Sequence, residues 1–440
     1  MRGGIHPTSG EDKEVTKEKP IRNFVPDEVK MEGNFFVKKG ESVKKGEKIG
    51  TDFWKIPLHA SITGTVREVD ETWCMITGKK EDIDKEKKSF PYQEKLIQEI
   101  SESAEEIIGK IKEAGIVGMG GAGFPTYFKY ETKKEITYLL INAAECEPFL
   151  TCDERLMIEN GYAVLNGILA LKKAADAKKA ILCIEDNKRE AAQFLQELLN
   201  PGQELQKENG KKENQDDREI QILLLPTRYP QGGERQLIQT VLKKEVPIGG
   251  LPADVGVIVS NVATAKAAAD AVFADQPLTE RIVTVTGAVE DPGNYLVPIG
   301  TPIEMLLELS GGVCEKENKI ILGGPMTGKC VAENWNGETL PTVKKTTSGV
   351  IAMLFQKEKE TPCIRCGACI RACPAGLAPF QIDIAYLDED EKLCEMLYAS
   401  ECIACGCCSY VCPAKRELTH RIVKAREIVR QKRKERSEKK

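Results

Sequence analysis

The chain has 440 residues, of which 41% are hydrophobic and 30% are charged, and its formal net charge is −5. This composition predicts folded cores in about three domains and excludes wholesale disorder. The first residues lack the apolar segment of a secretory signal, and no run approaches the roughly 18 apolar residues of a membrane helix, so we expect a soluble or peripheral protein. The acidic balance argues against nucleic acid as a partner.

Residues 1–95 predict a small β module that follows an N-terminal segment. The stretch FFVKKGESVKKGEKIGTDFW, followed by LHASITGTVREV, predicts short strands joined by glycine turns, as in a small barrel or sandwich. It resembles the barrel-sandwich modules of lipoyl and biotinyl domains, which carry a modified lysine at a hairpin tip. Lys55 lies in the comparable stretch, but the residues around it differ from that pattern. We therefore expect a docking or structural module.

Residues 96–277 predict an α/β domain. A first helix is expected over 101–114, with Ser101 or Ser103 as its cap and Gly115 at its end. After it, strand-like runs alternate with helical patterns, which is typical of a mostly parallel sheet. The strands are expected at 137–143, 180–185, 219–225 and 255–261, and the helices near 154–175, 189–199, 234–244 and 263–274. The polar segment 200–218 is predicted to be a mobile surface insertion.

Residues 278–345 change character. A strand, the turn DPGNY, a second strand and a helix follow one another, and this order resembles the β-grasp of SLBB domains. The helix is predicted to have Thr301 at its N-cap, Pro302 at its first position and Gly311 after its end. The whole chain is therefore expected to be a multidomain protein of the α/β and α+β classes.

Two cysteine motifs dominate residues 346–414. The chain has 16 cysteines, and more than half of them lie between Cys363 and Cys412, which suits metal ligation better than a spread disulfide framework. The run CIRCGACIRACP begins at residue 363, and CIACGCCSYVCP begins at residue 402. Both have the C-x2-C-x2-C-x3-C-P spacing of bacterial ferredoxins, in which the fourth cysteine serves the other cluster. We therefore predict a helical, ferredoxin-like domain with two [4Fe–4S] clusters.

The spacing also predicts which cysteines bind each cluster. Three thiolates, each separated from the next by two residues, can wrap one face of a cluster, while the fourth points away and needs a distant partner. Cys407 is left over in this register, and a pair of zinc sites is the alternative, because C-x2-C pairs also bind zinc. No catalytic residue is expected here, since a fully ligated cluster only conducts electrons. The first cluster is assigned to Cys363, Cys366, Cys369 and Cys412, and the second to Cys402, Cys405, Cys408 and Cys373.

Residues 118–126, GMGGAGFPT, form a glycine-rich segment. Gly118, Gly120 and Gly123 match G-x-G-x-x-G, but a dinucleotide-binding fingerprint needs a strand before it, and a predicted helix precedes this one. Four glycines within six residues let the backbone approach a planar or phosphorylated ligand, and successive N–H groups can bind an anion. A tight structural turn is the alternative.

The same segment resembles the G-x-G-G-x-G-F-P-T signature of the FMN- and NADH-binding subunit of respiratory complex I. Three further segments resemble that family in the same order: NAAECEP from Asn142, YPQGGE from Tyr229 and SNVAT from Ser260. In the family these segments line the flavin and nicotinamide pocket. The resemblance implies cofactor-binding roles for Gly118, Gly120, Gly121, Gly123, Phe124, Lys129, Asn142, Glu145, Glu147, Tyr229, Gly232, Glu234 and Asn261.

The chain departs from that family at three positions of these segments. Gly233 and Ala263 stand where the family has glutamate, and Ser260 stands where it has asparagine. These departures weaken the expectation of nicotinamide binding more than that of flavin binding.

The order of the modules, beginning with GGIHP near the start, resembles the RnfC subunit of the Rnf ion-translocating ferredoxin:NAD oxidoreductase. The resemblance implies a peripheral subunit at the cytoplasmic face of the cell membrane, which passes electrons between NAD(H), FMN and the two clusters. Its implied partners are the other subunits, including a ferredoxin-linked one, and the membrane surface through the complex. The alternatives are a non-enzymatic iron–sulfur relay with a degenerate flavin site, and a flavoprotein similar to cobalamin reductase.

Residues 415–440 hold twelve lysines and arginines against four glutamates. They are predicted to form a solvated basic helix, and docking to an anionic membrane or an acidic partner is the alternative.

Overall fold

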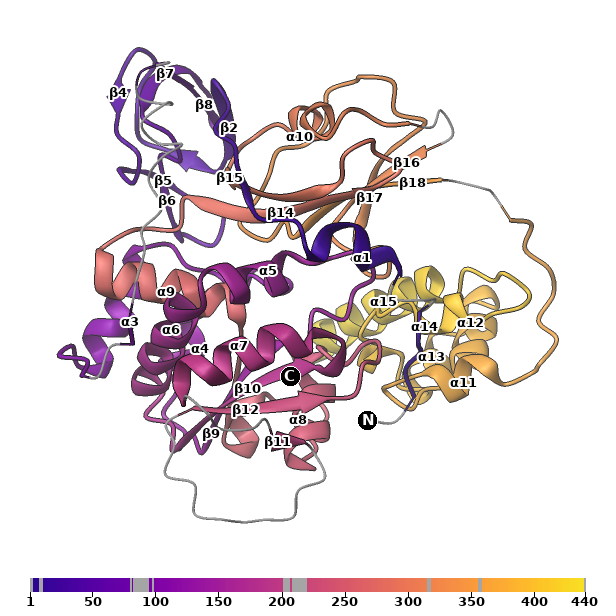
Figure 1. The fold of residues 1–440 in the computed structure, drawn as a ribbon. Helices are drawn as coiled ribbons and strands as arrows, with labels where there is room; N and C mark the ends of the chain where they lie inside the picture. Colours follow the sequence, from indigo (N-terminus) through magenta and orange to yellow (C-terminus); the bar gives the residue numbers. More distant parts are fainter. Residues whose placement is uncertain are drawn as a thin grey trace.

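The computed structural model describes residues 3–7, 11–79, 81, 95–96, 99–200, 206–207, 220–314, 318–354 and 358–438. Figure 1 shows a small β module and a mixed sheet side by side at the top, an α/β domain below them, and a helical domain in yellow at the right. The expected combination of α/β and α+β parts is confirmed, because parallel, antiparallel and mixed sheets occur in one chain.

The N-terminal β module consists of two small sheets that share an apolar core, with the strand orders β2-β8-β7-β4 and β3-β5-β6. The hairpin between β5 and β6 has Lys55 at its exposed tip, where φ is 61°. Asp52 Oδ1 accepts hydrogen bonds of 2.8 Å from the backbone N–H groups of Trp54 and Ile56, so the tip is a well-defined turn. The strands are β2 (Glu28–Glu32), β3 (Asn34–Phe35), β4 (Ser42–Val43), β5 (Lys48–Thr51), β6 (Pro57–His59), β7 (Gly64–Val69) and β8 (Trp73–Gly78).

The α/β domain is built on a parallel sheet with the order β11-β12-β10-β9-β13, as the alternating pattern predicts. Leu139 and Ile141 of β9 belong to the apolar core that includes residues of α3, α6 and α9 on one face, whereas Leu140 belongs to a second core with residues of α8 on the other. The predicted insertion at 200–218 lies outside the described residues except for its end at Asn200 and strand β11. The strands are β9 (Tyr138–Ala143), β10 (Lys179–Glu185), β11 (Gln206–Lys207), β12 (Ile220–Leu225) and β13 (Val257–Asn261), and the helices are α3 (Ala104–Glu113), α4 (Thr126–Tyr130), α5 (Cys152–Glu159), α6 (Gly161–Ala174), α7 (Arg189–Leu199), α8 (Glu234–Leu242) and α9 (Val262–Ala274).

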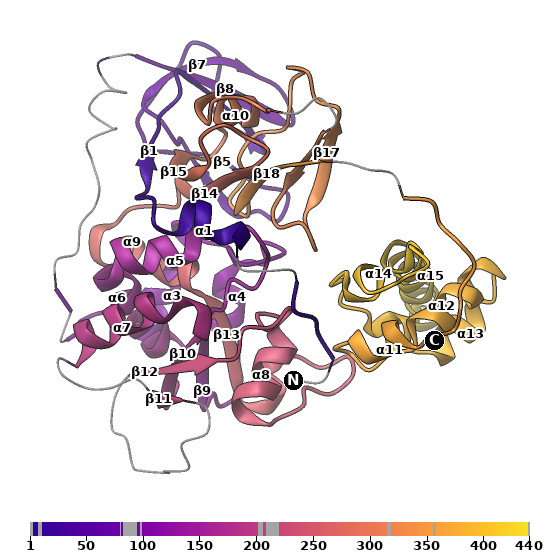
Figure 2. The same ribbon diagram turned by 45° about the vertical axis from the view of Figure 1, so that its right-hand side comes forward.

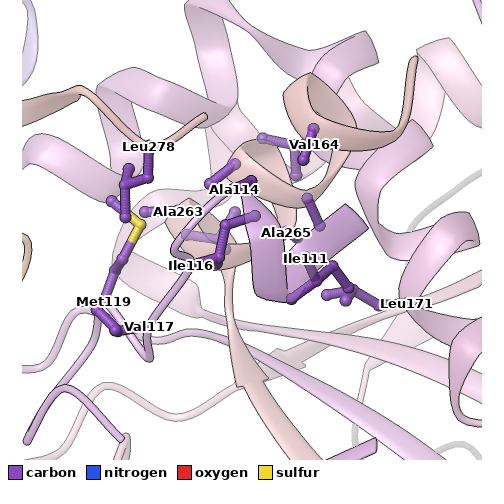
Figure 3. Close-up of a cluster of buried hydrophobic side chains, with 14 of the residues drawn as sticks. Ile111, Ala114, Ile116, Val117, Met119, Val164, Leu171, Ala263, Ala265 and Leu278 are labelled. Atoms are coloured by element: carbon purple, nitrogen blue, oxygen red, sulfur yellow. The ribbon is translucent and has the colours of Figure 1, made fainter. Parts of the chain in front are cut away.

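The helical layer behind the glycine segment is closely packed. Helix α3 begins with a capping box, because Ser103 Oγ accepts from the N–H of Glu106 while the Glu106 carboxylate accepts from the N–H of Ser103. A Cβ on Gly167 of α6 would lie 1.8 Å from the carbonyl oxygen of Ala265, so only glycine allows α6 and α9 to approach this closely. Figure 3 shows the resulting core, in which side chains of α3, α6 and α9 meet those of residues 114–119 and Leu278: Ile111, Ala114, Ile116, Val117, Met119, Val164, Leu171, Ala263, Ala265 and Leu278.

The third part is a mixed sheet with the order β1-β15-β14-β18-β16-β17, and it extends to Leu354, beyond the expected domain end at residue 345. The predicted N-cap of its helix is wrong by one residue. Pro302 occupies the N-cap, because the buried Thr301 hydroxyl donates to the carbonyl oxygen of Pro298 instead of capping. Gly311, with φ of 82°, follows the helix end as predicted. The elements are α1 (Glu11–Lys17), β1 (Arg22–Asn23), β14 (Glu280–Gly287), β15 (Gly293–Pro298), α10 (Ile303–Leu309), β16 (Asn318–Leu322), β17 (Lys329–Glu333) and β18 (Gly349–Leu354).

The C-terminal part is helical, and the basic helix α15 is integral to it. Ile422, Ala425 and Val429 are buried in a core that also contains Cys369 and Cys408, so the prediction of a plainly solvated helix is wrong. None of the helices in the described part of the chain combines the length and the apolar character needed to span a bilayer. The helices are α11 (Ala368–Ala372), α12 (Pro379–Leu387), α13 (Glu391–Met396), α14 (Cys407–Tyr410) and α15 (Leu418–Glu438).

Replacing Asp383 of α12 with alanine should loosen α15. The Asp383 carboxylate is 0% exposed and forms ion pairs of 2.6 Å with Arg416 and 3.1 Å with Arg421. Removing it leaves two cations without this partner in a partly buried site, and breaking such a pair typically costs about 3 kcal/mol. We expect the bound clusters to lose their visible absorbance at a lower urea concentration. The exposed neighbour Asp388 provides the control, and equal urea midpoints for the two alanine variants would contradict this account.

Candidate flavin pocket and cluster cavities

The glycine segment folds into a closed loop between α3 and α4. Val117 and Pro125 form an isolated antiparallel bridge, and the N–H of Gly118 donates to the carbonyl oxygen of Phe124 over 2.8 Å. Gly123 has a φ of 71°, in the left-handed region that favours glycine. The ring of Phe124 remains 50% exposed, so the loop presents an aromatic side chain beside its open backbone.

The two central glycines of the loop have different surroundings. A Cβ on Gly120 would lie 2.9 Å from Nδ2 of Asn261, whereas a Cβ on Gly121 would meet no atom within 4 Å. One side of the loop therefore rests on Asn261, and the other side is open. This is a cradle that a planar or phosphorylated group could approach, so the residues present fit an FMN-type ligand.

Asn142 and Asn261 lie opposite each other at the carboxyl ends of the neighbouring strands β9 and β13. Asn142 Nδ2 donates to the carbonyl oxygen of Gly232 over 2.8 Å, and Asn261 Nδ2 donates to Asp153 over 2.8 Å. Asn261 Oδ1 also caps α9 by accepting from the N–H of Ala263. The carboxyl end of a parallel sheet is where open α/β folds bind their ligands. Four of the predicted binding residues, Gly120, Asn142, Gly232 and Asn261, thus meet at this edge.

Lys129 and Glu234 meet at the border of the same region. Lys129 Nζ donates to the carbonyl oxygen of Val259 over 2.9 Å and lies 3.3 Å from Oε1 of Glu234. Glu234 is the first residue of α8 and is partly exposed, with 44% of its side chain accessible. One cation and one anion therefore stand together at a solvent-accessible edge, where either could pair with a ligand instead.

Three other predicted binding residues contact neighbouring elements. The Glu145 carboxylate accepts from the N–H groups of Asp153 and Glu154 and so caps α5. The Glu147 carboxylate accepts from the N–H of Met326 and the hydroxyl of Thr327. Burial raises the pKa of Glu147.

The third of these residues is Tyr229, which is 2% exposed and contacts the helical domain. Its hydroxyl donates to the carbonyl oxygen of Cys405 over 2.8 Å. Glu147 and Tyr229 therefore connect the α/β domain to the mixed sheet and to the helical domain, in addition to any role in binding a ligand.

Sequence reasoning missed the residue that fixes the glycine loop from the side of the mixed sheet. Arg281 of β14 donates from Nη2 to the carbonyl oxygen of Met119 over 2.9 Å and from Nε to the carbonyl oxygen of Thr347. From the α/β domain, the Thr264 hydroxyl accepts from the N–H of Met119. Thr264 lies within the segment SNVAT, which pointed to the pocket. Arg281 lies in a strand-like run that matches no such segment, so no sequence pattern indicated its contact with the loop.

Asp153, behind Asn261, should make stability depend on pH. Burial, followed by the nearby Glu145, raises the pKa of Asp153 from 3.8 to about 6. Between these values the folded state binds more protons than the unfolded state, so the free energy of unfolding falls as pH rises. Asp153→Asn keeps an acceptor for Asn261 and should stabilise the protein by about 1–3 kcal/mol near neutral pH.

Thermal unfolding of the cofactor-free chain measures this effect. The midpoint of Asp153→Asn should exceed that of the parent at neutral pH, and the difference should shrink toward pH 4, where the Asp153 carboxyl of the folded parent is protonated and uncharged like the amide. Asp388→Asn, at an exposed position, is the control. A difference that is constant across this pH range would contradict the prediction.

The motif cysteines line two separate cavities. The first is lined by four cysteines together with Phe380 and Leu418, and the second by five together with Leu377 and Ile422. Each set includes one cysteine from the other motif, which matches the exchange expected from the spacing, and the thiol-lined, apolar walls fit an iron–sulfur cluster. Cys407 lines the second cavity beside Cys405 and is 0% exposed. The first cavity has Cys363, Cys366, Cys369 and Cys412, and the second has Cys373, Cys402, Cys405, Cys407 and Cys408.

Family models match four parts of the chain. They describe an RnfC barrel sandwich hybrid domain over residues 1–84, a Nuo51 FMN-binding domain over residues 111–270, an SLBB domain over residues 282–329 and a 4Fe-4S dicluster domain over residues 355–413. The expected classes of cofactor, FMN and two [4Fe–4S] clusters, are thereby confirmed at the level of domains.

Similar proteins agree with these matches. The C subunit of the proton-translocating ferredoxin:NAD(+) oxidoreductase complex of Clostridium ljungdahlii is 36% identical over 87% of this chain and 84% of its own length. The C subunit of the ion-translocating oxidoreductase complex of Pasteurella multocida is 34% identical over 90% of this chain, which spans 47% of that relative. A chain of an NAD+-reducing [NiFe]-hydrogenase, at 20% identity, has a TM-score of 0.50 over 72% of this chain and 63% of its own, and shows a similar fold.

The fold, the glycine cradle and the two cysteine cavities together define an electron-transfer protein of the flavin and iron–sulfur class. More particularly, the chain belongs to the RnfC family, whose members are the C subunits of ion-translocating ferredoxin:NAD oxidoreductase complexes.

Proposed function

We propose that the chain passes electrons between NAD(H) and two [4Fe–4S] clusters by way of FMN, as a peripheral subunit at the cytoplasmic face of a membrane-bound, ion-translocating oxidoreductase. The observation that carries the proposal is the combination of an open glycine cradle and two cysteine-lined cavities in one chain. The names of the relatives, which are subunits of ferredoxin:NAD(+) or ion-translocating oxidoreductase complexes, support it.

The chain's own residues would bind and orient the cofactors. FMN, when bound, converts the two-electron chemistry of a hydride into single-electron transfers. The loop N–H groups and Lys129 would hold its phosphate, and Asn142 and Asn261 would border it from the ends of the strands. Glu234 at the exposed edge would bind the nicotinamide ribose. Glu147, which accepts two hydrogen bonds from residues 326–327, would fix the border of the pocket between two domains.

The cysteine ligands belong to the same proposal. Cys363, Cys366, Cys369 and Cys412 would hold one cluster, and Cys402, Cys405, Cys408 and Cys373 the other. Cys407, although buried beside the second set, would remain a thiol. The clusters would then deliver electrons to, or collect them from, another subunit of the complex.

A relay without flavin chemistry is the second candidate. It is favoured by the three positions at which the chain departs from the complex I family. Ser260 and Ala263 are buried, and a Cβ on Gly233 would lie 2.4 Å from Gln236, so these positions leave little room for the larger side chains of that family. A protein of this kind would keep the clusters and the domain contacts of Glu147 and Tyr229 but would bind no flavin.

One experiment separates the two candidates. The purified chain, reconstituted with iron, sulfide and FMN, is desalted and assayed for bound flavin and for bleaching of cluster absorbance by NADH. The proposal expects stoichiometric FMN and bleaching by NADH as well as by dithionite. Bleaching by dithionite alone, with no flavin retained, would overturn the flavin and nicotinamide part and leave the relay.

A further inference from the structure

The N-terminal GGIHP segment contacts both the α/β domain and the helical domain. The N–H of Gly4 donates to the carbonyl oxygen of Ala372 over 2.8 Å, and Ile5 exchanges two backbone hydrogen bonds with Tyr229, of 2.8 and 2.9 Å. In both views the indigo N-terminal trace passes beside α11 (Figures 1 and 2). A Cβ on Gly3 would lie 2.4 Å from the carbonyl oxygen of Cys373, so only glycine fits there.

This contact adjoins the second cysteine cavity. Ile5, Tyr229 and Cys407 are buried together in one apolar cluster, with Ala372 as its fourth fully buried member. The Tyr229 hydroxyl reaches the carbonyl oxygen of Cys405. Two cysteines of the second cavity, Cys373 and Cys405, are therefore held directly against the N-terminal segment and the α/β domain.

The four-residue segment 229–232 reaches the candidate flavin pocket at its other end. Tyr229 begins the segment, and Gly232 ends it by accepting the hydrogen bond of Asn142. The backbone between them is held by a bond from the N–H of Gly233 to the carbonyl oxygen of Pro230. A short, hydrogen-bonded path therefore joins Asn142 to Cys405.

The first cavity has a different environment. Cys366 is exposed and its neighbour Ile364 is 67% exposed, so the rim of this cavity faces solvent. Electron transfer needs close approach of the two cofactors, which the buried contact of the second cavity offers. An exposed rim instead suits exchange with a separate protein.

We propose that the cluster of Cys373, Cys402, Cys405 and Cys408 is the one that exchanges electrons with the flavin pocket, and that Tyr229, clamped by Gly4 and Ile5, is the positioning residue of this contact. The inference rests on the proposed function. Each transfer moves a single electron and neither makes nor breaks a bond in the protein. NADH supplies the electron pair, and the other cluster passes the electrons on.

The test uses the full chain with clusters and FMN, and the variants Tyr229→Phe and Gly4→Pro. Tyr229→Phe removes the hydroxyl that donates toward Cys405 and should lower the midpoint potential of one cluster only, in an EPR-monitored titration, because a lost donor destabilises the more negative reduced state. Reduction by NADH should slow by about fivefold, the factor that one neutral hydrogen bond typically contributes. Reduction by dithionite and the amount of bound FMN should not change.

Gly4→Pro removes the N–H that binds Ala372, and proline cannot adopt the φ of 83° at this position, so the variant disrupts the contact of the N-terminal segment while leaving the Tyr229 side chain unaltered. Hydrogen exchange around residues 229 and 372 should accelerate, and reduction by NADH should slow. Tyr398→Phe, at a 54% exposed tyrosine of the helical domain, is the control. Cys366→Ser should retain only the second cluster, and adding Tyr229→Phe should still shift the potential of that cluster. Cys402→Ser should retain only the first cluster, and adding Tyr229→Phe should leave its potential unchanged.

The outcomes distinguish the inference from the proposed function. Unchanged potentials in Tyr229→Phe, or a shift of the cluster retained in Cys402→Ser, would overturn the inference even if the parent reacts with NADH. A parent that does not react with NADH would overturn the proposed function, while the potential measurement would still decide whether Tyr229 acts on the second cluster.

Discussion

Gly120→Leu should strongly weaken FMN binding while leaving both clusters intact. The position has no room for a side chain, because a Cβ would lie 2.9 Å from Nδ2 and 3.0 Å from Cβ of Asn261. Asn261 cannot move freely, since it caps α9 and donates to the buried Asp153. The loop would have to rise from the strand ends and enter the space proposed for the flavin. We expect a loss of about 3 kcal/mol in FMN binding, or roughly a hundredfold in Kd.

Gly121→Ala provides a matched control in the adjacent residue. A Cβ at this position would meet no atom within 4 Å, so the loop should keep its conformation. FMN titration by fluorescence quenching gives the Kd of each variant, and dithionite reduction reports on the clusters. Equal FMN affinities in Gly120→Leu and the parent would show that the flavin does not use this loop. Simultaneous loss of the clusters would show that the substitution unfolds the chain.

The local parts of this structure follow from sequence patterns. The spacing of each cysteine motif, the alternation of strands and helices and the capping box at Ser103 each depend on residues close together in the chain. Such features are predictable because the backbone brings neighbours together in a known geometry. The glycine loop belongs to the same group, although its ligand does not follow from its glycines.

Contacts between domains could not be predicted in this way. Arg281 reaches the glycine loop across 162 residues, and Tyr229 reaches Cys405 across 176. Neither side chain belongs to a pattern that specifies its partner, because the pairing depends on how whole domains pack. The burial of α15 is similar, since its composition is that of a solvated helix. Only the spacing of Ile422, Ala425 and Val429 along one face indicates the core beneath it.

Cys412→Ser should remove the cluster of the motif that begins at residue 363, about 50 residues earlier in the chain. Cys412 lines the cavity of the first motif, and Cys373 lines that of the second. Iron content should fall from about eight to about four atoms per chain in either serine variant, because each loses one four-iron cluster. Iron content alone does not show which cluster is lost, so the EPR spectrum of the remaining cluster is the decisive measurement.

Pairs of variants make that measurement specific. Under the exchanged arrangement, Cys412→Ser and Cys366→Ser should share one residual spectrum, and Cys373→Ser and Cys402→Ser should share the other. Unexchanged ligands would instead pair Cys412→Ser with Cys402→Ser. Cys330→Ser, at an exposed cysteine outside both motifs, should retain the full iron content.

The exchange has a consequence for stability that the same variants test. In the exchanged arrangement each motif supplies a ligand to both clusters, so the loss of one cluster should weaken the site of the other. The apolar core of this domain includes Cys369 from the first cavity and Cys408 from the second, so the two sites also share their packing. The cluster that remains in Cys412→Ser should therefore lose iron to a chelator faster than it does in the parent. Equal rates would show that the two sites fold independently.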